Sequence, residues 1–339
     1  METQKKDSLF KVAVAVLNWN GRKLLEQFLP KVEEFSSEAD IYLIDNGSDD
    51  DSIPYVELHH PGIKIIRNGI NYGPSEGYNE GLRGIKADIY CLLSSDVEVT
   101  EYWLNPIIEI FSKYPEIAAI QPKILDQRRR DHFEYAGAAG GFIDNRGYPY
   151  CRGRLFDTIE SDKGQYDDTS ETLWCIGACL FVKSKMFWEV GGFDAGFFAY
   201  MEEVDLCWRL RNTGYKIYYT AQSVVYHLGG GTLNPKSATR IFRMFSHNLL
   251  MLVKNLPVKA LLMVLLTRLL LDVSAGITFF FMKSPRHAWA VVRAHFYFYK
   301  NFSTYYKKRT RYPIKDYYHH KNIVFQYFIL GRKDFRTLK

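Results

Sequence analysis

The chain has 339 residues, of which 47% are hydrophobic, 24% charged and 16% aromatic. This apolar share supports a packed core and excludes a wholly disordered chain, and the length suits two domains of roughly 150 residues each. The net charge of +6 is uneven, because residues 283–339 carry 14 basic and 2 acidic side chains and residues 1–282 carry a net charge of −6. This distribution predicts an anionic partner for the C-terminal end only.

The first 121 residues alternate short apolar runs with amphipathic segments. The apolar runs predict strands at 12–17, 41–44, 63–67, 89–93 and 117–121. The segments between them predict helices at 22–35, 52–58, 75–85 and 102–113. This alternation predicts an α/β fold with a mostly parallel central sheet and helices on both faces.

Beyond residue 121 the pattern is less regular. The glycine-rich segment 137–153 indicates a hairpin or a loop over a cleft. The apolar run 173–183 predicts one continuous strand, and a helix at 204–212 follows it. A further strand at 217–219 continues toward His227, which precedes three glycines at 229–231. We expect this first domain to end near residue 240.

The remaining residues, 241–339, predict a helical, membrane-associating region. The segment 260–281 is apolar and long enough to span a bilayer. Arg268 and Asp272 lie near its middle, however, and a charged pair is costly at the bilayer centre. Aromatic and basic residues alternate through 288–318, which is typical of a membrane interface. A helix in the interface is therefore favoured, followed by a spanning helix and then by a core helix.

The five cysteines predict free thiols. Their number is odd, and residues 1–11 are too polar for a secretory signal, so we expect a reducing, cytosolic setting. Cys175 and Cys179 have a spacing that could bind a metal. They lie in an apolar run, so buried thiols are the better interpretation.

Polar clusters follow three of the predicted strands. They occupy residues 18–20, 45–49 and 94–98. Asn, Asp, Gly and Ser are common in turns for backbone reasons alone. In an open α/β sheet, however, ligands bind beyond the carboxyl ends of the strands, so three such clusters together predict a binding site at this edge.

The segment 71–81 contains glycines at every fourth position from Gly73 onward. This spacing matches neither a dinucleotide-binding fingerprint nor a P-loop. For Gly81, close packing of a helix on the sheet explains the glycine as well as a ligand does. For Asn71 and Asn79, a polar ligand is the favoured interpretation.

Five motifs occur in a characteristic order along residues 11–231. They are Asp45-Asn46-Gly47-Ser48, the run from Asn71 to Gly81, Ser94-Ser95-Asp96, Gly191-Gly192-Phe193-Asp194, and the segment from Tyr200 to Arg209. Together they resemble family 2 glycosyltransferases with a GT-A fold, especially the branch that includes rhamnosyltransferases of cell-surface polysaccharide synthesis. The resemblance implies a nucleotide-sugar donor bound to a Rossmann-like sheet.

The resemblance also assigns donor and metal residues. It places Asp45 at the base or ribose, and it makes Asp96 a ligand of Mn²⁺ or Mg²⁺ with His227 as a second ligand. Ser94 replaces the first aspartate of the family's Asp-x-Asp motif, and Glu98 could provide a shifted one. The implied nucleotide-sugar site comprises Asn18, Asn20, Asp45, Asn71, Gly73, Asn79, Ser95 and Asp96.

For the catalytic base the resemblance implies a carboxylate at the start of the helix near residue 202. Glu203 ranks first, Asp205 second and Glu202 third. Acidic residues also occur at helix N-termini because they complement the helix dipole. Trp174 and Gly177 are expected on the acceptor side, although a core position suits the tryptophan equally well.

The resemblance implies an inverting glycosyltransferase that transfers rhamnose or another hexose from a UDP- or dTDP-sugar, with dTDP-rhamnose as the leading donor. The expected acceptor is a lipid-linked or cell-surface glycan, reached at the cytoplasmic face of the membrane. Two alternatives stay open: a nucleotidyltransferase of sugar phosphates, and a non-catalytic glycan-binding module with a degenerate metal site. Nucleic acid is not an expected partner, because the first 282 residues are acidic and no groove-reading motif occurs.

Overall fold

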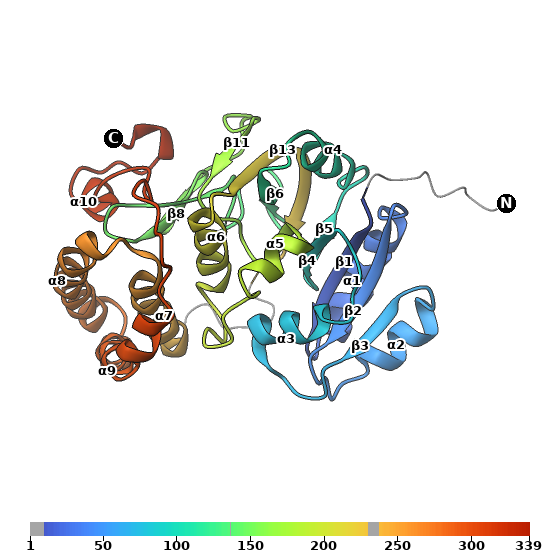
Figure 1. The fold of residues 1–339 in the computed structure, drawn as a ribbon, viewed down its shortest axis with the longest axis horizontal. Helices are drawn as coiled ribbons and strands as arrows, with labels where there is room; N and C mark the ends of the chain where they lie inside the picture. The colour runs from blue at the N-terminus through green and yellow to red at the C-terminus, as the bar shows by residue number, and fades with distance from the viewer. Residues whose placement is uncertain (1–9, 136, 230–236) are drawn as a thin grey trace.

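A nine-stranded sheet runs through the molecule (Figure 1). The computed structural model describes residues 10–135, 137–229 and 237–339, so two of the three glycines at 229–231 and the polar start of the chain lie outside the described residues. The strand order is β11-β13-β6-β12-β4-β1-β2-β3, and β5 pairs with β13. The strands are β1 (Val12–Asn18), β2 (Ala39–Asp45), β3 (Lys64–Arg67), β4 (Ile89–Ser94), β5 (Val97–Val99), β6 (Ile117–Asp126), β11 (Thr169–Thr172), β12 (Cys179–Lys183) and β13 (Lys216–His227).

The sheet confirms the predicted α/β class. β1 pairs in parallel with β2 and β4, β2 with β3, and β6 with β13, whereas β12 is antiparallel between β4 and β6. The prediction of one strand over 173–183 was wrong. Only the second half of that run is a strand, β12, because residues 173–178 leave the sheet after β11 and the backbone of Trp174 bonds Gly141 instead (N–O 3.0 Å).

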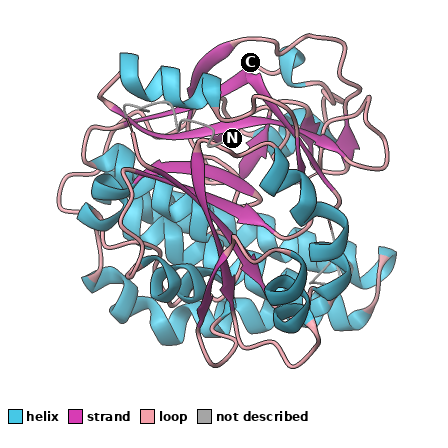
Figure 2. Ribbon diagram, turned by 90° about the vertical axis from the view of Figure 1, so that its right-hand side faces the viewer, coloured by secondary structure: helices cyan, strands magenta, loops and turns pink. Residues whose placement is uncertain are grey.

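Helices lie on both sides of the twisted sheet (Figure 2). They are α1 (Arg22–Glu34), α2 (Ser52–His59), α3 (Gly73–Leu82), α4 (Asn105–Lys113), α5 (Ser184–Glu189) and α6 (Glu202–Asn212). α3 packs on β1 and β2, and α6 packs on β13. A Cβ at Gly81 would come within 2.6 Å of the Ile44 side chain, so this glycine permits close helix–sheet packing.

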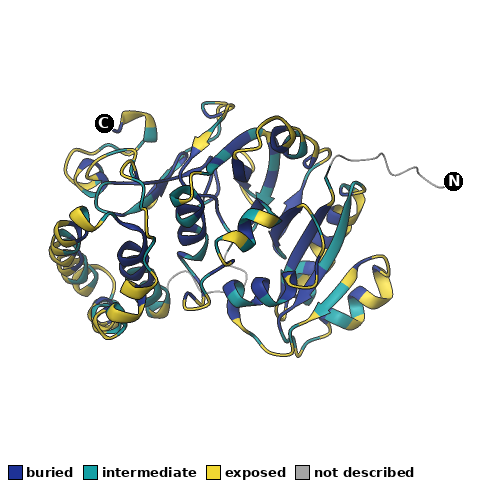
Figure 3. Cartoon of the chain, in the orientation of Figure 1, coloured by how far each residue is buried: buried dark blue, intermediate teal, exposed yellow. Residues whose placement is uncertain are grey.

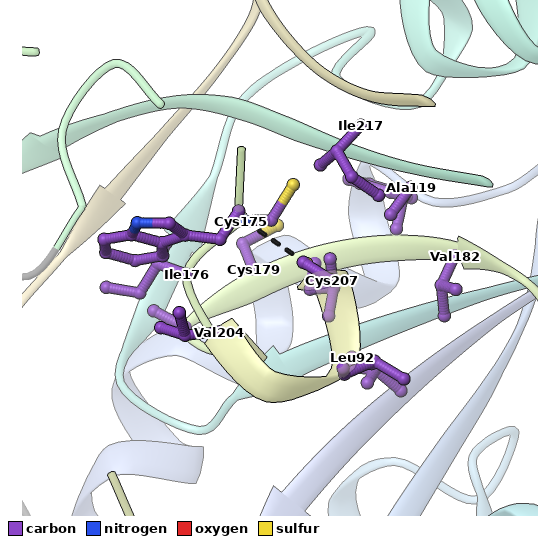
Figure 4. Packing of buried hydrophobic residues seen from close by; sticks show 14 of the residues in the cluster. Leu92, Ala119, Cys175, Ile176, Cys179, Val182, Val204, Cys207 and Ile217 are labelled. Atoms are coloured by element: carbon purple, nitrogen blue, oxygen red, sulfur yellow. Dashed lines mark hydrogen bonds between the residues drawn. The ribbon is translucent and has the colours of Figure 1, made fainter. Parts of the chain in front are cut away.

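The core beneath α6 is apolar and includes buried thiols (Figure 4). The backbone N–H of Cys175 lies 3.4 Å from Cys207 Sγ, beside Val204 and Ile217. All five cysteines are buried and free, which confirms the interpretation of Cys175 and Cys179 as structural thiols.

The C-terminal helices share the core of the sheet. They are α7 (Ala238–Asn255), α8 (Val258–Met282), α9 (Pro285–Lys307) and α10 (Ile323–Phe328). α7 packs against α6 and α9, and one hydrophobic cluster extends from β1 to residue 338. The chain then returns to a small second sheet, where His319 N bonds the carbonyl of Ile143 at 3.0 Å. That sheet comprises β7 (Gly141–Ile143), β8 (Pro149–Cys151), β9 (Arg154–Leu155) and β10 (Thr158–Ile159).

Candidate active site

The carboxyl ends of β1, β2 and β4 lie side by side, as the polar clusters predict. Asn18 is in register with Asp45, and its amide Nδ2 lies 3.3 Å from Asp45 Oδ1 and 3.1 Å from Ser48 Oγ. Asn18 Oδ1 is buried without a hydrogen-bond partner among the described residues. Ser95 lies close by, because a Cβ at Gly21 would be 3.5 Å from its hydroxyl. This edge therefore holds a cluster of polar groups with an acceptor still available.

The loop after β1 is tied to the loop after β2. Asn20 adopts a positive φ of 50°, its backbone N–H donates to Ser48 Oγ at 2.9 Å, and its amide donates to Asp49 Oδ1 at 2.5 Å. Asn and Asp tolerate this left-handed conformation better than other side chains do. The predicted donor residues Asn18, Asn20 and Asp45 are thus brought together.

Asn46 organises the loop before α3, a role that the sequence analysis missed. Its Nδ2 donates to Asn71 Oδ1 and to the Gly73 carbonyl, both at 3.1 Å, and its Oδ1 accepts from Asn68 at 3.2 Å. Asn71 Oδ1 also accepts from Gly73 N at 2.8 Å. Gly73 has φ 76° and lies against the Phe198 backbone, which no larger residue would permit. Asn71 and Gly73 are therefore held beside Asp45.

Asn79 is used differently from what the ligand interpretation expects. Its Nδ2 donates to the Phe193 carbonyl at 2.9 Å and to Glu76 Oε2 at 2.8 Å, and its Oδ1 accepts from Phe193 N at 2.9 Å. The side chain is buried and its hydrogen-bonding capacity is used. The structure therefore gives Asn79 the task of fixing the loop before α6, because both of its donors have protein partners.

Asp96 and His227 meet at the next strand ends. β5 pairs with the end of β13, which brings His227 Nε2 within 3.2 Å of Asp96 Oδ1. Glu134, which the sequence analysis missed, lies on the other side of the ring, 3.3 Å from Nδ1. Burial opposes the charged imidazole, but Glu134 and Asp96 together raise the pKa of His227 well above its usual value. The three groups form a buried acid–base–acid row.

The shifted metal motif at Glu98 is unavailable in this conformation. Its carboxylate bonds Lys31 Nζ at 2.5 Å and Arg130 Nη2 at 2.7 Å. No group of three or more His, Cys, Asp or Glu residues that could hold a metal occurs in the described part of the chain. Asp96 and His227 therefore provide two ligands at most, which suits an ion that completes its shell with phosphate oxygens and water.

The N-terminus of α6 carries two interacting glutamates. Oε2 of Glu202 and Oε2 of Glu203 are both buried without a hydrogen-bond partner within the described ranges. Burial raises the pKa of Glu203 to about 7, and burial together with the charge of Glu203 raises that of Glu202 well above its usual value. The preceding Tyr200 and Met201 have φ of 71° and 74°, a strained geometry that is frequent at functional sites.

Asp205, the second-ranked base, lies in a separate, fully bonded cluster. Its Oδ2 accepts from Arg209 Nε at 2.7 Å and Lys254 Nζ at 2.8 Å, and its Oδ1 accepts from Asn255 at 2.9 Å. Burial opposes ionisation, but Lys254 and Arg209 hold the pKa of Asp205 below its usual value. These contacts anchor α6 to α7 and leave the carboxylate occupied.

Of the two predicted acceptor-side residues, only Gly177 faces a candidate catalytic group. A Cβ at Gly177 would lie 4.0 Å from Glu203 Cβ. Trp174 is buried, donates its indole N–H to the Phe142 carbonyl at 2.9 Å and packs on Gly141. The tryptophan therefore takes the core position, the alternative considered from the sequence.

The structure thus brings Asp96 and His227, which are distant in sequence, into direct contact at the strand ends. Glu203 lies at the start of α6, beside Gly177.

Comparisons with known proteins agree with the predicted family and fold. Residues 13–191 match the family model described as glycosyl transferase family 2. The chain is 25% identical over 239 residues to an N-acetylglucosaminyl-diphospho-decaprenol L-rhamnosyltransferase of Mycobacterium tuberculosis, covering 65% of this chain and 76% of the relative.

Solved structures share the fold. S. aureus TarS 1-349 in complex with UDP-GlcNAc matches with a TM-score of 0.55 and 12% identity, over 88% of this chain and 90% of that one. GalNAc-T7 with UDP, GalNAc and Mn²⁺ matches with a TM-score of 0.55 and 18% identity, over 73% of this chain but only 48% of that one. The predicted fold is confirmed, and because the family match covers more than half of the chain, this protein is a glycosyltransferase that belongs to glycosyl transferase family 2.

Proposed function

We propose that this enzyme transfers a sugar, with inversion, from a nucleoside-diphosphate sugar to a hydroxyl group of a lipid-linked glycan. The observation that carries the proposal is Glu203, whose carboxylate has one buried, unpartnered oxygen among the described residues and a pKa raised to about 7. A general base works best when its pKa lies near the operating pH. The polar side chains at the strand ends, among them Asn18 and Asp45, are the proposed donor site.

In the proposed reaction the acceptor hydroxyl attacks the anomeric carbon from the side opposite the diphosphate. Its proton passes to Glu203, the new bond forms between the acceptor oxygen and the anomeric carbon, and the bond to the phosphate oxygen breaks. The diphosphate leaves with the bonding electron pair. Glu202 and Glu203 titrate as an interacting pair, and Glu203, whose Cβ lies 4.0 Å from the Cβ position of Gly177 on the acceptor side, is the proposed proton acceptor.

Asp96 and His227 are the proposed holders of a divalent cation. A cation bound there would neutralise charge on the leaving diphosphate. Glu134 orients the ring of His227 from the opposite side at 3.3 Å, as carboxylates commonly do for metal-binding histidines. Mn²⁺ suits an imidazole ligand better than Mg²⁺ does, and it is the ion named in the GalNAc-T7 structure.

The donor and acceptor are proposed from relatives and from residues near the base. The mycobacterial relative is named an L-rhamnosyltransferase that acts on a diphospho-decaprenol lipid, so dTDP-rhamnose and a lipid-linked acceptor are the leading candidates. Arg240 and Arg243 of α7 lie near Tyr200, and Arg243 also acts on the charge of Glu202. Their positive charge suits an acceptor phosphate at the cytoplasmic face of a membrane.

The test is release of nucleoside diphosphate from a panel of dTDP-, UDP- and GDP-sugars, with Mn²⁺, with Mg²⁺ or with chelator. Glu203→Gln should reduce transfer by about 100-fold or more while nucleotide binding stays unchanged. Glu109→Gln, on the exposed surface of α4, is the matched control and should behave as the unmodified enzyme. Normal turnover by Glu203→Gln would refute the assigned base, and no saturable nucleotide binding would favour the non-catalytic alternative.

A further inference from the structure

The charged pair in α8 faces the protein. Arg268 Nε lies 3.3 Å from Asp272 Oδ1, and the two side chains are 2% and 0% exposed. Arg268 also bonds Asn248 of α7, while Asp272 accepts from Tyr148 at 3.1 Å and lies 3.2 Å from His295 of α9. α8 meets the length and composition of a membrane span, yet crossing a bilayer would require all these contacts to break.

The opposite side of α8 is apolar and exposed, and α9 extends it. We call this surface the α8–α9 face; much of it is exposed in Figure 3. Its large exposed side chains are Val258, Leu262, Met263, Leu266, Leu269, Leu270, Val273, Ile277, Phe280, Phe281, Met282, Trp289, Val292, Phe296 and Tyr299. A contiguous apolar surface of this kind marks an interaction site.

A groove between α8 and α9 opens on this face. It encloses about 500 Å³, and its walls are almost entirely carbon. That volume lies within the roughly 300–1,000 Å³ that is usual for small-molecule sites. The residues that line the groove are Leu269, Asp272, Val273, Gly276, Ile277, Phe280, Phe281, Ala288, Val291, Val292, His295, Phe296 and Tyr299.

Gly276 keeps the groove open, and the local structure gives no other reason for it. Glycine inside a helix costs about 1 kcal/mol relative to alanine. The φ of Gly276 is not positive, and an added Cβ would lie 3.9 Å from Val291 Cβ, which is ordinary contact. Neither backbone strain nor tight packing requires a glycine here, so its evident effect is to leave space between the helices.

The charges on this region favour a lipid surface over a second copy of the chain. Residues 258–307 contain seven basic residues and one acidic residue, and the buried pair accounts for one of each. The remaining six cations, all exposed, are Lys259, Lys283, Arg286, Arg293, Lys300 and Lys307. If two copies met on this face, their positive charges would lie opposite one another and repel, whereas anionic headgroups would neutralise these charges. Trp289 and Tyr299 have the amphipathic rings that settle at such an interface.

We propose that the groove binds one acyl chain of a phospholipid while the α8–α9 face lies flat in the interface of an anionic bilayer. This inference rests on the proposed membrane-linked function. Phe279 of α8 packs on Phe245 of α7, and Arg293 of α9 lies 5.2 Å from the ring of Phe242. The same N-terminal half of α7 carries Arg240, which lies 5.7 Å from the ring of Tyr200, just before Glu202. Docking on this face therefore keeps the acceptor side of the site near the membrane surface.

The surface is tested by sedimentation of the full chain with vesicles of phosphatidylglycerol and phosphatidylethanolamine. Leu266→Glu combined with Leu270→Glu should weaken binding at least tenfold, because two charges would enter the apolar layer. Both positions lie outside the groove lining. Leu58→Glu, at a 75% exposed leucine of α2, is the matched control and should bind as the unmodified chain does. Equal sedimentation of the double variant would overturn the surface.

The groove is tested by calorimetric titration of the chain with diheptanoyl phosphatidylglycerol, kept below its critical micelle concentration. The unmodified chain should show saturable binding at one site. Gly276→Leu should weaken it at least tenfold by filling the groove, and Gly276→Ala should weaken it less. Leucine favours helix more than glycine does, so an unchanged circular dichroism spectrum is expected. Undiminished binding by Gly276→Leu would overturn the groove.

Two further results would also contradict the inference. Self-association that disappears in the Leu266→Glu, Leu270→Glu variant would assign the face to a second copy. Vesicle-bound protein that resists alkaline extraction would indicate a spanning helix. Nucleotide binding is measured on the same variants, because it tests the site at the strand ends and α6 independently of the α8–α9 face. A failure of lipid binding is therefore distinguishable from a failure of the proposed transfer.

Discussion

The first turn of α6 carries carboxylates in two contrasting environments. Asp205 is bonded by Arg209, Lys254 and Asn255, and its pKa is lowered. Glu203, two residues earlier, has an unpartnered buried oxygen, and its pKa is raised to about 7. Each carboxylate has at least one buried oxygen, so burial alone does not identify a functional group. The difference is hydrogen-bond saturation: a saturated carboxylate stabilises the fold, and an unsaturated one is available for a proton or a ligand.

α8 repeats the first of these environments. In the sequence, Arg268 and Asp272 lie in the middle of an apolar segment that could span a bilayer. In the structure both are bonded within the protein, as Asp205 is. The pair therefore anchors α8 to its neighbours and leaves the outer side of the helix predominantly apolar.

Removing the cation of the saturated cluster should have the largest effect. Lys254 bonds both Asp205 and Asp194, at 2.8 and 2.7 Å. Lys254→Met would leave buried charge unpaired, so the free energy of unfolding should fall by about 3–5 kcal/mol. Urea denaturation measures this. Lys64→Met, at a 54% exposed lysine, is the control and should change it by less than about 1 kcal/mol. Equal effects of the two would show that the cluster is not structural.

The pH dependence of activity and stability tests Glu203, the unsaturated carboxylate of the comparison. Because the pKa of Glu203 is about 7, kcat/KM should rise about tenfold per pH unit below that value and level off above it. Stability should change in the opposite direction. Above the ordinary glutamate pKa, the folded state retains a proton that the unfolded chain has lost. The free energy of unfolding should therefore fall as the pH rises toward about 7. Glu203→Gln should reduce that slope in urea titrations at pH 5 to 8, and an unchanged slope would assign it to other groups, such as Glu202.

The smallest effect is expected at Glu98. Its partners Lys31 and Arg130 are about half exposed, so Glu98→Gln should change the free energy of unfolding by less than about 1 kcal/mol. Mn²⁺-dependent nucleotide binding, measured by calorimetry, should stay unchanged. A large loss of that binding would instead support the shifted metal motif and weaken the contrast between bonded and available carboxylates.

Local pattern was sufficient to predict the framework of the sheet. The strands at 12–17, 41–44, 63–67, 89–93 and 117–121 and the helices between them are all present, with ends shifted by a few residues. Apolar periodicity reports which side of an element is buried, and that depends on neighbours in sequence. The run 173–183 was misread because it is apolar throughout, and such a run does not reveal where it leaves a sheet.

What the sequence by itself determined is the fold class, the order of the motifs and the family to which they belong. Only the tertiary structure decided which polar groups are satisfied, because their partners are distant in the chain. Glu134 meets His227, Lys254 meets Asp205, and Asn79 bonds Phe193 across 114 positions. A residue's type sets what it can donate or accept, whereas its availability for chemistry depends on long-range packing that local pattern does not encode.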